Sequence, residues 1–147
     1  MTDLNTFDGK KFLTESSDQT KKLGSDFASC LKPGDIVFFA GDLGAGKTTF
    51  IQGIMLKFGI KKFVRSASFL LVSEFKTKDM SLYHLDLYRL GETNIYDLGL
   101  DEYLFGSGIS LVEWSERLTG CRKQKRWEIK MRYIDDNKRE IRLKRFK

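Results

Sequence analysis

One stretch of the sequence decides the fold, Gly41-Asp42-Leu43-Gly44-Ala45-Gly46-Lys47-Thr48, because it matches the phosphate-binding pattern G-x-x-x-x-G-K-[ST], the P-loop. Glycines in such a loop adopt left-handed backbone conformations and let consecutive N–H groups approach an anion closely. A helix that begins at about Lys47 points its positive end at the same anion. Lys47 brings a positive charge to the β- and γ-phosphates, and Thr48 offers a hydroxyl to Mg²⁺. The stretch therefore predicts a nucleotide phosphate site.

The flanking residues predict the strand and the helix that this motif requires. Residues 36–40 form a short, continuous apolar run, which is typical of a strand buried on both faces. After the loop, apolar side chains recur at i, i+3, i+4 and i+7 and predict a helix that ends near Gly59: Ile51, Ile54, Met55 and Phe58. A plain glycine-rich turn is the alternative, but it does not account for this strand, loop and helix order.

The rest of the chain carries both helical and strand patterns. Capping residues 14–17 precede a predicted helix that Pro33 follows, with four side chains on one apolar face: Leu23, Phe27, Cys30 and Leu31. Residues 69–72 and 80–87 predict a hairpin, and residues 92–104 a helix. Residues 109–112 are typical of another short buried strand.

The last segment predicts a C-terminal β-hairpin. Apolar and charged side chains alternate from Trp127 to Tyr133, and the apolar face continues at Ile141 and Leu143. Strands and helices together indicate an α/β fold, a P-loop NTPase-like mixed β-sheet flanked by helices. At 147 residues we expect a single P-loop ATPase domain over residues 1–147.

Composition excludes several classes of protein. The longest apolar run in the first half of the chain has five residues, too few for a membrane-spanning helix, so no membrane association is expected. No secretory signal is visible, and Cys30 and Cys121 fit neither a zinc pattern nor a disulfide framework. The single histidine excludes a multi-histidine metal centre. We therefore expect a cytoplasmic protein with reduced thiols.

The net charge of +6 is concentrated at the C-terminal end. Residues 122–147 hold 12 Lys and Arg against 4 Asp and Glu, and the rest of the chain is slightly acidic. Such a segment suits RNA, an acidic partner or nucleotide phosphates. The alternative is a solvated strand face that keeps a small protein soluble.

Two acidic residues follow apolar strands and are candidates for the acid that a P-loop needs to hold Mg²⁺ or to orient water. Glu113 comes directly after residues 109–112, and Asp86 comes after residues 82–85. Ordinary surface carboxylates are the alternative for each of them. His84 is interpreted as a structural histidine rather than a general base. Residues 137–140 (Asn-Lys-Arg-Glu) resemble a guanine-binding motif, but we interpret them as part of a hairpin turn. This interpretation favours ATP over GTP as the nucleotide.

Five blocks of sequence, in order, resemble the bacterial TsaE (YjeE) family over about residues 14–145. They are residues 41–50, Ser66-Ala67-Ser68-Phe69, residues 84–90 (His-Leu-Asp-Leu-Tyr-Arg-Leu), Leu98-Gly99-Leu100 and Glu113-Trp114. The resemblance implies a small ATPase needed to make N6-threonylcarbamoyladenosine (t6A) beside the anticodon of tRNA. It also implies the TsaD and TsaB proteins as partners, with ATP hydrolysis supporting the turnover of that assembly.

Carried over motif by motif, the resemblance implies these site residues. Lys47, Asp86 and Glu113 would be catalytic, and Thr48 and Glu113 would hold the metal. The nucleotide would be lined by Ser17, Asp42, Leu43, Gly44, Ala45, Gly46, Lys47, Thr48, Thr49 and Arg139. Trp114 would lie beside the site. Residues 66–69 resemble a switch-like loop in which Ala67 and Ser68 replace the family's proline and threonine.

Two other functions fit the sequence less well. A free-standing small-molecule P-loop kinase needs an arginine-bearing lid, and Arg117, Arg122 and Arg126 run straight into the alternating tail strand. A basic RNA-binding module with a vestigial P-loop is disfavoured by the intact Lys47-Thr48 pair and by Glu113.

Overall fold

The structure is a computed structural model that describes residues 6–42, 45–61, 72–120 and 125–147. Several residues singled out above lie outside this part of the chain: Leu43, Gly44, residues 66–69, Cys121 and Arg122.

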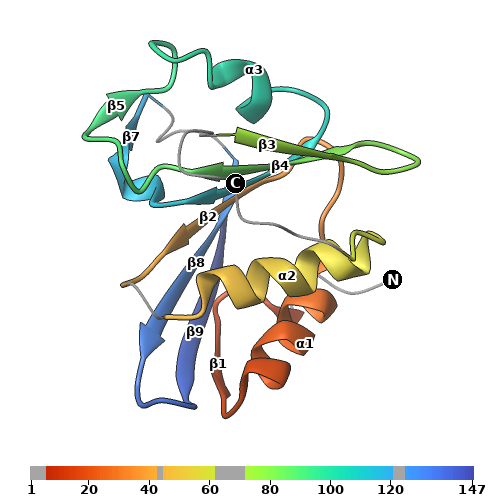
Figure 1. The fold of residues 1–147 in the computed structure, drawn as a ribbon, viewed down its shortest axis with the longest axis vertical. Coiled ribbons are helices and arrows are strands. Elements are labelled where there is room, and N and C mark those ends of the chain that lie inside the picture. The colour runs from red at the N-terminus through yellow and green to blue at the C-terminus, as the bar shows by residue number, and fades with distance from the viewer. Residues whose placement is uncertain (1–5, 43–44, 62–71, 121–124) are drawn as a thin grey trace.

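A mixed sheet of seven strands forms the centre of the described fold, in the order β1-β9-β8-β2-β6-β4-β3 (Figure 1). The neighbours β8–β2, β2–β6 and β6–β4 are parallel, and the outer pairs are antiparallel. The strands are β1 (Lys10–Thr14), β2 (Ile36–Ala40), β3 (Val72–Lys76), β4 (Ser81–Asp86), β6 (Ile109–Glu113), β8 (Arg126–Tyr133) and β9 (Arg139–Phe146). The predicted α/β class, the mixed sheet and the C-terminal hairpin β8–β9 are confirmed.

One face of the sheet is covered by α1 (Ser17–Ala28) and α2 (Lys47–Lys57), which lie side by side (Figure 1). Two glycines let these helices approach closely. A Cβ atom added at Gly24 would lie 2.2 Å from the Phe50 carbonyl oxygen, and one added at Gly53 would lie 2.0 Å from the Lys21 carbonyl oxygen. The larger core cluster fills the space between these helices and the sheet.

The other face is covered only in part among the described residues. A second core cluster joins Ile36 and Phe38 of β2 to residues of β4, β6 and the segment that contains α3 (Asp101–Leu104). A small two-stranded sheet of β5 (Thr93–Asn94) and β7 (Leu118–Thr119) lies in the same region, with a 3-10 turn over Ser115–Arg117. Neither cluster includes an outward-facing residue of β1, β8 or β9.

The predicted helix over residues 92–104 is wrong in its extent. The segment instead contains β5, a series of turns and the single turn of α3. The Asn94 side chain accepts a hydrogen bond from the Tyr96 N–H, a local bond that competes with helix formation. Gly99 has φ +69°, a left-handed conformation that interrupts a helix.

Two further differences concern the N-terminal part. The strand β1 was not predicted, because Lys10–Thr14 is a short edge strand with little apolar alternation. The first helix ends at Ala28, so Cys30 and Leu31 lie beyond it, although both are buried. Within the described residues we find no helix that is both long and apolar enough to cross a membrane.

Candidate nucleotide site

The two described glycines of the loop after β2, Gly41 and Gly46, both have positive φ. Gly46 has φ +94° and caps the start of α2, and Phe50 N–H donates to the Gly46 carbonyl as the helix begins. Gly41 has φ +147°, and a Cβ atom there would lie 2.3 Å from the Met131 carbonyl oxygen of β8. Glycine is therefore needed at both ends of the loop, for conformation at Gly46 and for space at Gly41.

Lys47 is buried at the first position of α2, and its ammonium group folds back over the loop. Nζ donates a hydrogen bond to the Gly41 carbonyl at 2.6 Å and lies 3.6 Å from the centre of the Trp114 ring. The charge is thus held at the mouth of the loop by a carbonyl and an aromatic face. Thr48 and Thr49 are half-buried in the first turn, Ala45 is buried and Asp42 is exposed.

The two predicted acids lie next to each other at the carboxyl ends of neighbouring strands. Asp86 ends β4 and pairs in parallel register with Glu113, which ends β6. Glu113 also pairs with Phe39 of β2, the strand that leads into the loop. Because side chains alternate along a strand, Glu113 faces the same side as Leu111, the side that carries α2. The fold therefore brings Glu113 and Asp86 to the edge of the sheet where the loop lies.

Glu113 is almost fully buried and is held by His84. Its Oε2 lies 2.7 Å from His84 Nε2, and both side chains are at most 1% exposed. Asp86 is half-buried, and its Oδ1 accepts a hydrogen bond from the Tyr88 N–H. From the sequence we interpreted His84 as a structural histidine, and its pairing with Glu113 was not predicted. The available signal was its spacing, because His84 precedes Asp86 by two residues and so shares its face of β4.

Two aromatic side chains, Trp114 and Tyr88, lie beside Lys47, and we call them the aromatic wall. Trp114 has φ +62°, and it is the one non-glycine residue with positive φ in the described ranges. Such a conformation is uncommon for a bulky side chain and is often found at functional sites. The Tyr88 ring lies 5.1 Å from the Trp114 ring, and the Arg117 guanidinium lies 5.1 Å from it. Arg117 also donates to the carbonyls of Leu87 and Leu90, which ties this wall to the chain after β4.

A small hollow of about 30 Å³ lies on the other side of the loop, where α1, α2 and the β8–β9 turn meet. Ser17 and Arg139, which only the family resemblance implied as nucleotide contacts, both line this hollow. Gly46 of the loop and Thr49 of α2 line it with them. The full lining is Ser16, Ser17, Thr20, Gly46, Thr49, Asp136, Asn137 and Arg139. Arg139 donates to the Lys138 carbonyl and lies 4.6 Å from the Tyr133 ring.

The turn that carries Arg139 is built by Asp135. Its Oδ1 accepts hydrogen bonds from the N–H groups of Asn137 and Lys138, both at 2.9 Å. These bonds hold the pKa of the Asp135 carboxyl below its usual value, because they stabilise the charged form. Residues 137–140 thus make a hairpin turn and the start of β9, as the sequence indicated.

The residues present fit a nucleotide phosphate group and a divalent cation. At the described ends of the loop, Gly46 has the left-handed backbone of an anion-binding turn, and Gly41 packs directly against the Met131 carbonyl of β8. Two buried N–H donors next to the loop, Trp114 Nε1 and Arg139 Nε, have no hydrogen-bond partner among the described residues. Such donors suit the oxygens of an anionic ligand. Hydroxyl and carboxylate oxygens, as on Thr48 and Glu113, are the ligands that Mg²⁺ prefers.

Comparison with known proteins points to one family. The family model described as threonylcarbamoyl adenosine biosynthesis protein TsaE matches residues 14–141. The chain is 40% identical over 131 residues to the tRNA threonylcarbamoyladenosine biosynthesis protein TsaE of Bacillus subtilis, which covers 89% of this chain and 82% of that protein. It is 38% identical over 138 residues to TsaE of Aquifex aeolicus, which covers 92% of this chain and 96% of that protein.

A solved structure shares the fold as well as the sequence. The crystal structure of YdiB from Bacillus subtilis superposes with a TM-score of 0.73 at 38% identity, covering 90% of this chain and 82% of that one. The predicted P-loop NTPase-like fold is thereby confirmed. Because both the family model and these relatives match most of the chain, the protein belongs to the TsaE family.

Proposed function

We propose that this protein is the Mg²⁺-dependent, ATP-binding and ATP-hydrolysing subunit required for t6A modification of tRNA next to the anticodon. One observation carries the proposal. Lys47 at the start of α2 and Glu113 at the end of β6 are both buried at the same edge of the sheet, beside a loop whose described glycines, Gly41 and Gly46, have positive φ. Membership of the TsaE family supports the role in tRNA modification.

Each residue has a role in this proposal. Lys47 leaves the Gly41 carbonyl to contact the phosphates of ATP or ADP, and Thr48 and Glu113 hold Mg²⁺. The metal supplies charge neutralisation at the phosphates. Asp86 acts as the second acid near the γ-phosphate, and His84 keeps the Glu113 carboxylate oriented. Ser17, Thr49 and Arg139 line the nucleotide on the side of the small hollow, and Asp42, Ala45 and Gly46 contribute backbone groups. Leu43 and Gly44 are proposed nucleotide contacts from the sequence motif alone.

The kinase alternative gains no support from the described arginines. Arg117 is tied to the Leu87 and Leu90 carbonyls, and Arg126 lies in β8 with its guanidinium 2.6 Å from Glu128. Both arginines therefore belong to the body of the fold rather than to a lid.

We also propose protein partners and a cellular location for this protein. We place the protein in the cytoplasm with TsaD and TsaB, and we assign the basic C-terminal segment to a tRNA contact. The isolated chain should hydrolyse ATP slowly, because a chain of 147 residues has little material for a lid over the loop. A neighbour that supplies charge in trans raises the rate of P-loop enzymes by about 10³–10⁵.

The experiment compares ATP hydrolysis by the chain alone, with the TsaD–TsaB pair, and with tRNA added. The proposal expects slow turnover alone and a large stimulation by the pair. Fast turnover by the isolated chain, unchanged by the pair, would instead support a free-standing enzyme.

A further inference from the structure

On the face of the sheet opposite α1 and α2, the part formed by β1, β8 and β9 has no helical cover among the described residues. In β8 and β9, Trp127, Ile129, Met131, Ile141 and Leu143 face α1 and α2 in the larger core cluster. The alternate residues of β1, β8 and β9 face the opposite side, where the second core cluster does not extend. We call this surface the basic face. By register it carries Lys11 and Leu13 of β1, Arg126, Glu128, Lys130 and Arg132 of β8, and Glu140, Arg142, Lys144 and Phe146 of β9.

The basic face is strongly positive. It holds six cationic side chains and two carboxylates, a net charge of +4. Both carboxylates are already paired, Glu128 with Arg126 and Glu140 with three cations. Lys130 and Lys144 are exposed and make no ion pair with a described residue. The excess positive charge is therefore available to an external anion.

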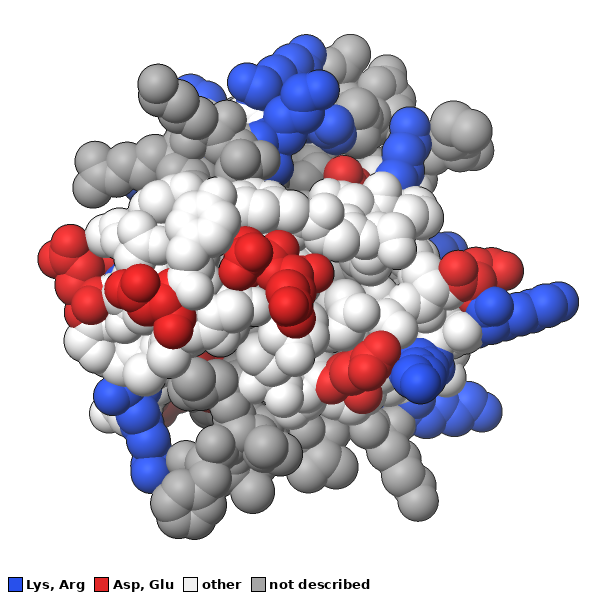
Figure 2. All heavy atoms as spheres, turned by 90° about the horizontal axis from the view of Figure 1, so that it is seen from above, with Lys and Arg blue, Asp and Glu red and all other residues white. Residues whose placement is uncertain are grey.

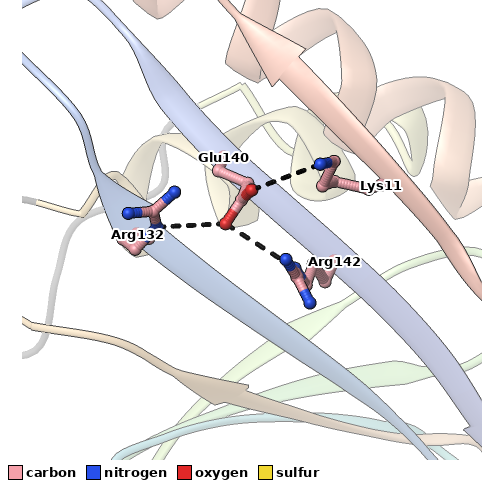
Figure 3. Close-up of polar contacts among 4 residues, drawn as sticks. All are labelled: Lys11, Arg132, Glu140 and Arg142. Carbon is pink, nitrogen blue, oxygen red and sulfur yellow. Dashed lines mark hydrogen bonds and ion pairs between the residues drawn. The ribbon is translucent and has the colours of Figure 1, made fainter.

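Glu140 organises the cations at the centre of this face (Figure 3). Its Oε2 lies 3.0 Å from Arg132 Nε and 3.6 Å from Arg142 Nε, and its Oε1 lies 3.7 Å from Lys11 Nζ. Its side chain is 9% exposed, whereas those of the three cations are 54% to 69% exposed. One buried carboxylate thus gathers three exposed cations around it, which lowers the entropy cost of ordering them on an anionic partner.

The face is also hollowed. A groove of about 470 Å³ runs across it, and its lining includes Lys11, Lys130, Arg142, Lys144 and Phe146. Side chains two residues apart on a strand lie about 6.6 Å apart, a spacing close to that of successive phosphates along a polynucleotide. Cationic side chains along a groove with an aromatic ring at one end are typical of nucleic-acid surfaces.

The opposite charge lies elsewhere on the molecule. Figure 2 looks onto the end that carries α3 and β5 in Figure 1, and acidic side chains are spread across the middle of that view. α3 itself contributes Asp101 and Glu102. Lys and Arg side chains gather at the upper and right edges of the same view, so a polyanion is repelled only from its middle and is attracted more strongly to the basic face.

We propose that the basic face binds the phosphate backbone of RNA, with Lys130, Arg142 and Lys144 as direct phosphate contacts. This inference rests on the proposed role in tRNA modification, which identifies tRNA as the RNA to test. It adds a binding surface separate from the loop that takes the nucleotide. The two are joined through β9, which starts at Arg139 beside Gly46 and continues across the basic face.

The test measures binding of a fluorescently labelled, unmodified tRNA transcript by anisotropy at several salt concentrations. The variant is Lys130→Ala/Lys144→Ala, and the matched control is Lys76→Ala/Lys78→Ala. The control removes the same charge from exposed positions at the β3–β4 hairpin, at the other edge of the sheet. Each lost phosphate contact lowers the slope of log K against log salt by about 0.7–0.9. The variant should lose about 1.4–1.8 from the slope and bind about 25- to 60-fold more weakly at 0.1 M salt. The control should change affinity less than threefold.

Three results would overturn the proposal: wild-type protein that does not bind the transcript, equal losses in variant and control, or unchanged RNA binding in a variant that no longer associates with TsaD–TsaB. The last result would assign the face to an acidic protein surface. Nucleotide binding and melting temperature are measured on every variant, and Lys130→Glu/Lys144→Glu should bind RNA more weakly still with both unchanged. A protein that hydrolyses ATP but does not bind RNA would contradict this inference and leave the proposed ATPase function standing. A protein that binds RNA but does not hydrolyse ATP would contradict only the proposed ATPase function.

Discussion

His84 Nε2 lies 2.7 Å from Glu113 Oε2, and both side chains are buried where β4 and β6 end side by side. A carboxylate in such a place is costly unless it is hydrogen-bonded. The contact therefore lets an acid be buried beside the glycine loop with a defined orientation.

We expect His84→Ala to lower the free energy of unfolding by about 1–3 kcal/mol, because it leaves the buried Glu113 carboxylate without this hydrogen bond. Urea denaturation measures the change. His84→Gln keeps a side-chain N–H donor and should lose less. If His84→Ala is as stable as the wild type, the contact does not hold the carboxylate.

Lys47→Ala should remove most of the stabilisation that the nucleotide gives. A ligand at 100 times its Kd adds about 2.7 kcal/mol to the stability of a protein that binds it only when folded. Thermal melting with ATP, ADP or GTP and Mg²⁺ measures the shift. Lys57→Ala, at the last position of α2 and exposed, is the control and should keep the wild-type shift. A wild-type protein that neither adenine nucleotide stabilises would contradict the assignment of the loop.

Gly53→Ala should destabilise the fold although alanine is the better helix former. The propensity gain is about 1 kcal/mol. The added Cβ atom, however, would lie 2.0 Å from the Lys21 carbonyl oxygen, so α1 and α2 must move apart, at a cost of about 1–3 kcal/mol or more. Gly91→Ala is the control, because nothing lies within 4 Å of a Cβ atom there. Equal stability of the two variants in urea would show that the helices do not need this close approach.

Glu140 should make the stability depend on pH in the acid range. The hydrogen bond from Arg132, with the nearby charges of Arg142 and Lys11, holds the pKa of the Glu140 carboxyl below its usual value of 4.5. A carboxyl with a lowered pKa in the folded state stabilises the fold above about pH 4.5 and loses that contribution as the pH falls. The fall in stability between pH 7 and pH 3 should therefore be smaller in Glu140→Gln than in the wild type. An equal fall would show that the cluster adds no net stability.

The sequence predicted best the elements whose patterns are local. The apolar run of β2, the glycine loop and the helical spacing after it gave strand, loop and α2 correctly, and the alternation from Trp127 onward gave the hairpin β8–β9. In each case short-range periodicity and burial indicate the same structure.

The errors come from interactions that periodicity does not encode. Residues 92–104 have helical apolar spacing. Three local features nevertheless prevent a continuous helix there: the hydrogen bond to the Asn94 side chain, the pairing of β5 with β7, and the left-handed conformation of Gly99. The contact between His84 and Glu113 joins residues 29 positions apart, so it depends on strand register. The positions of Glu113 and Asp86 at strand ends were predicted because each follows an apolar run, whereas the packing of Lys47 on Trp114 needed the three-dimensional structure.

The central claim is that the buried acid at the end of β6 serves ATP hydrolysis at the loop. The most direct measurement is phosphate release from ATP and Mg²⁺ in the presence of the TsaD–TsaB pair, comparing wild type, Glu113→Gln and Asp86→Asn, with nucleotide affinity measured on the same samples. The account predicts that both variants bind ATP within a few-fold of wild type and release phosphate at least about 100-fold more slowly, because these acids act most strongly in the transition state. Wild-type phosphate release by Glu113→Gln would contradict it.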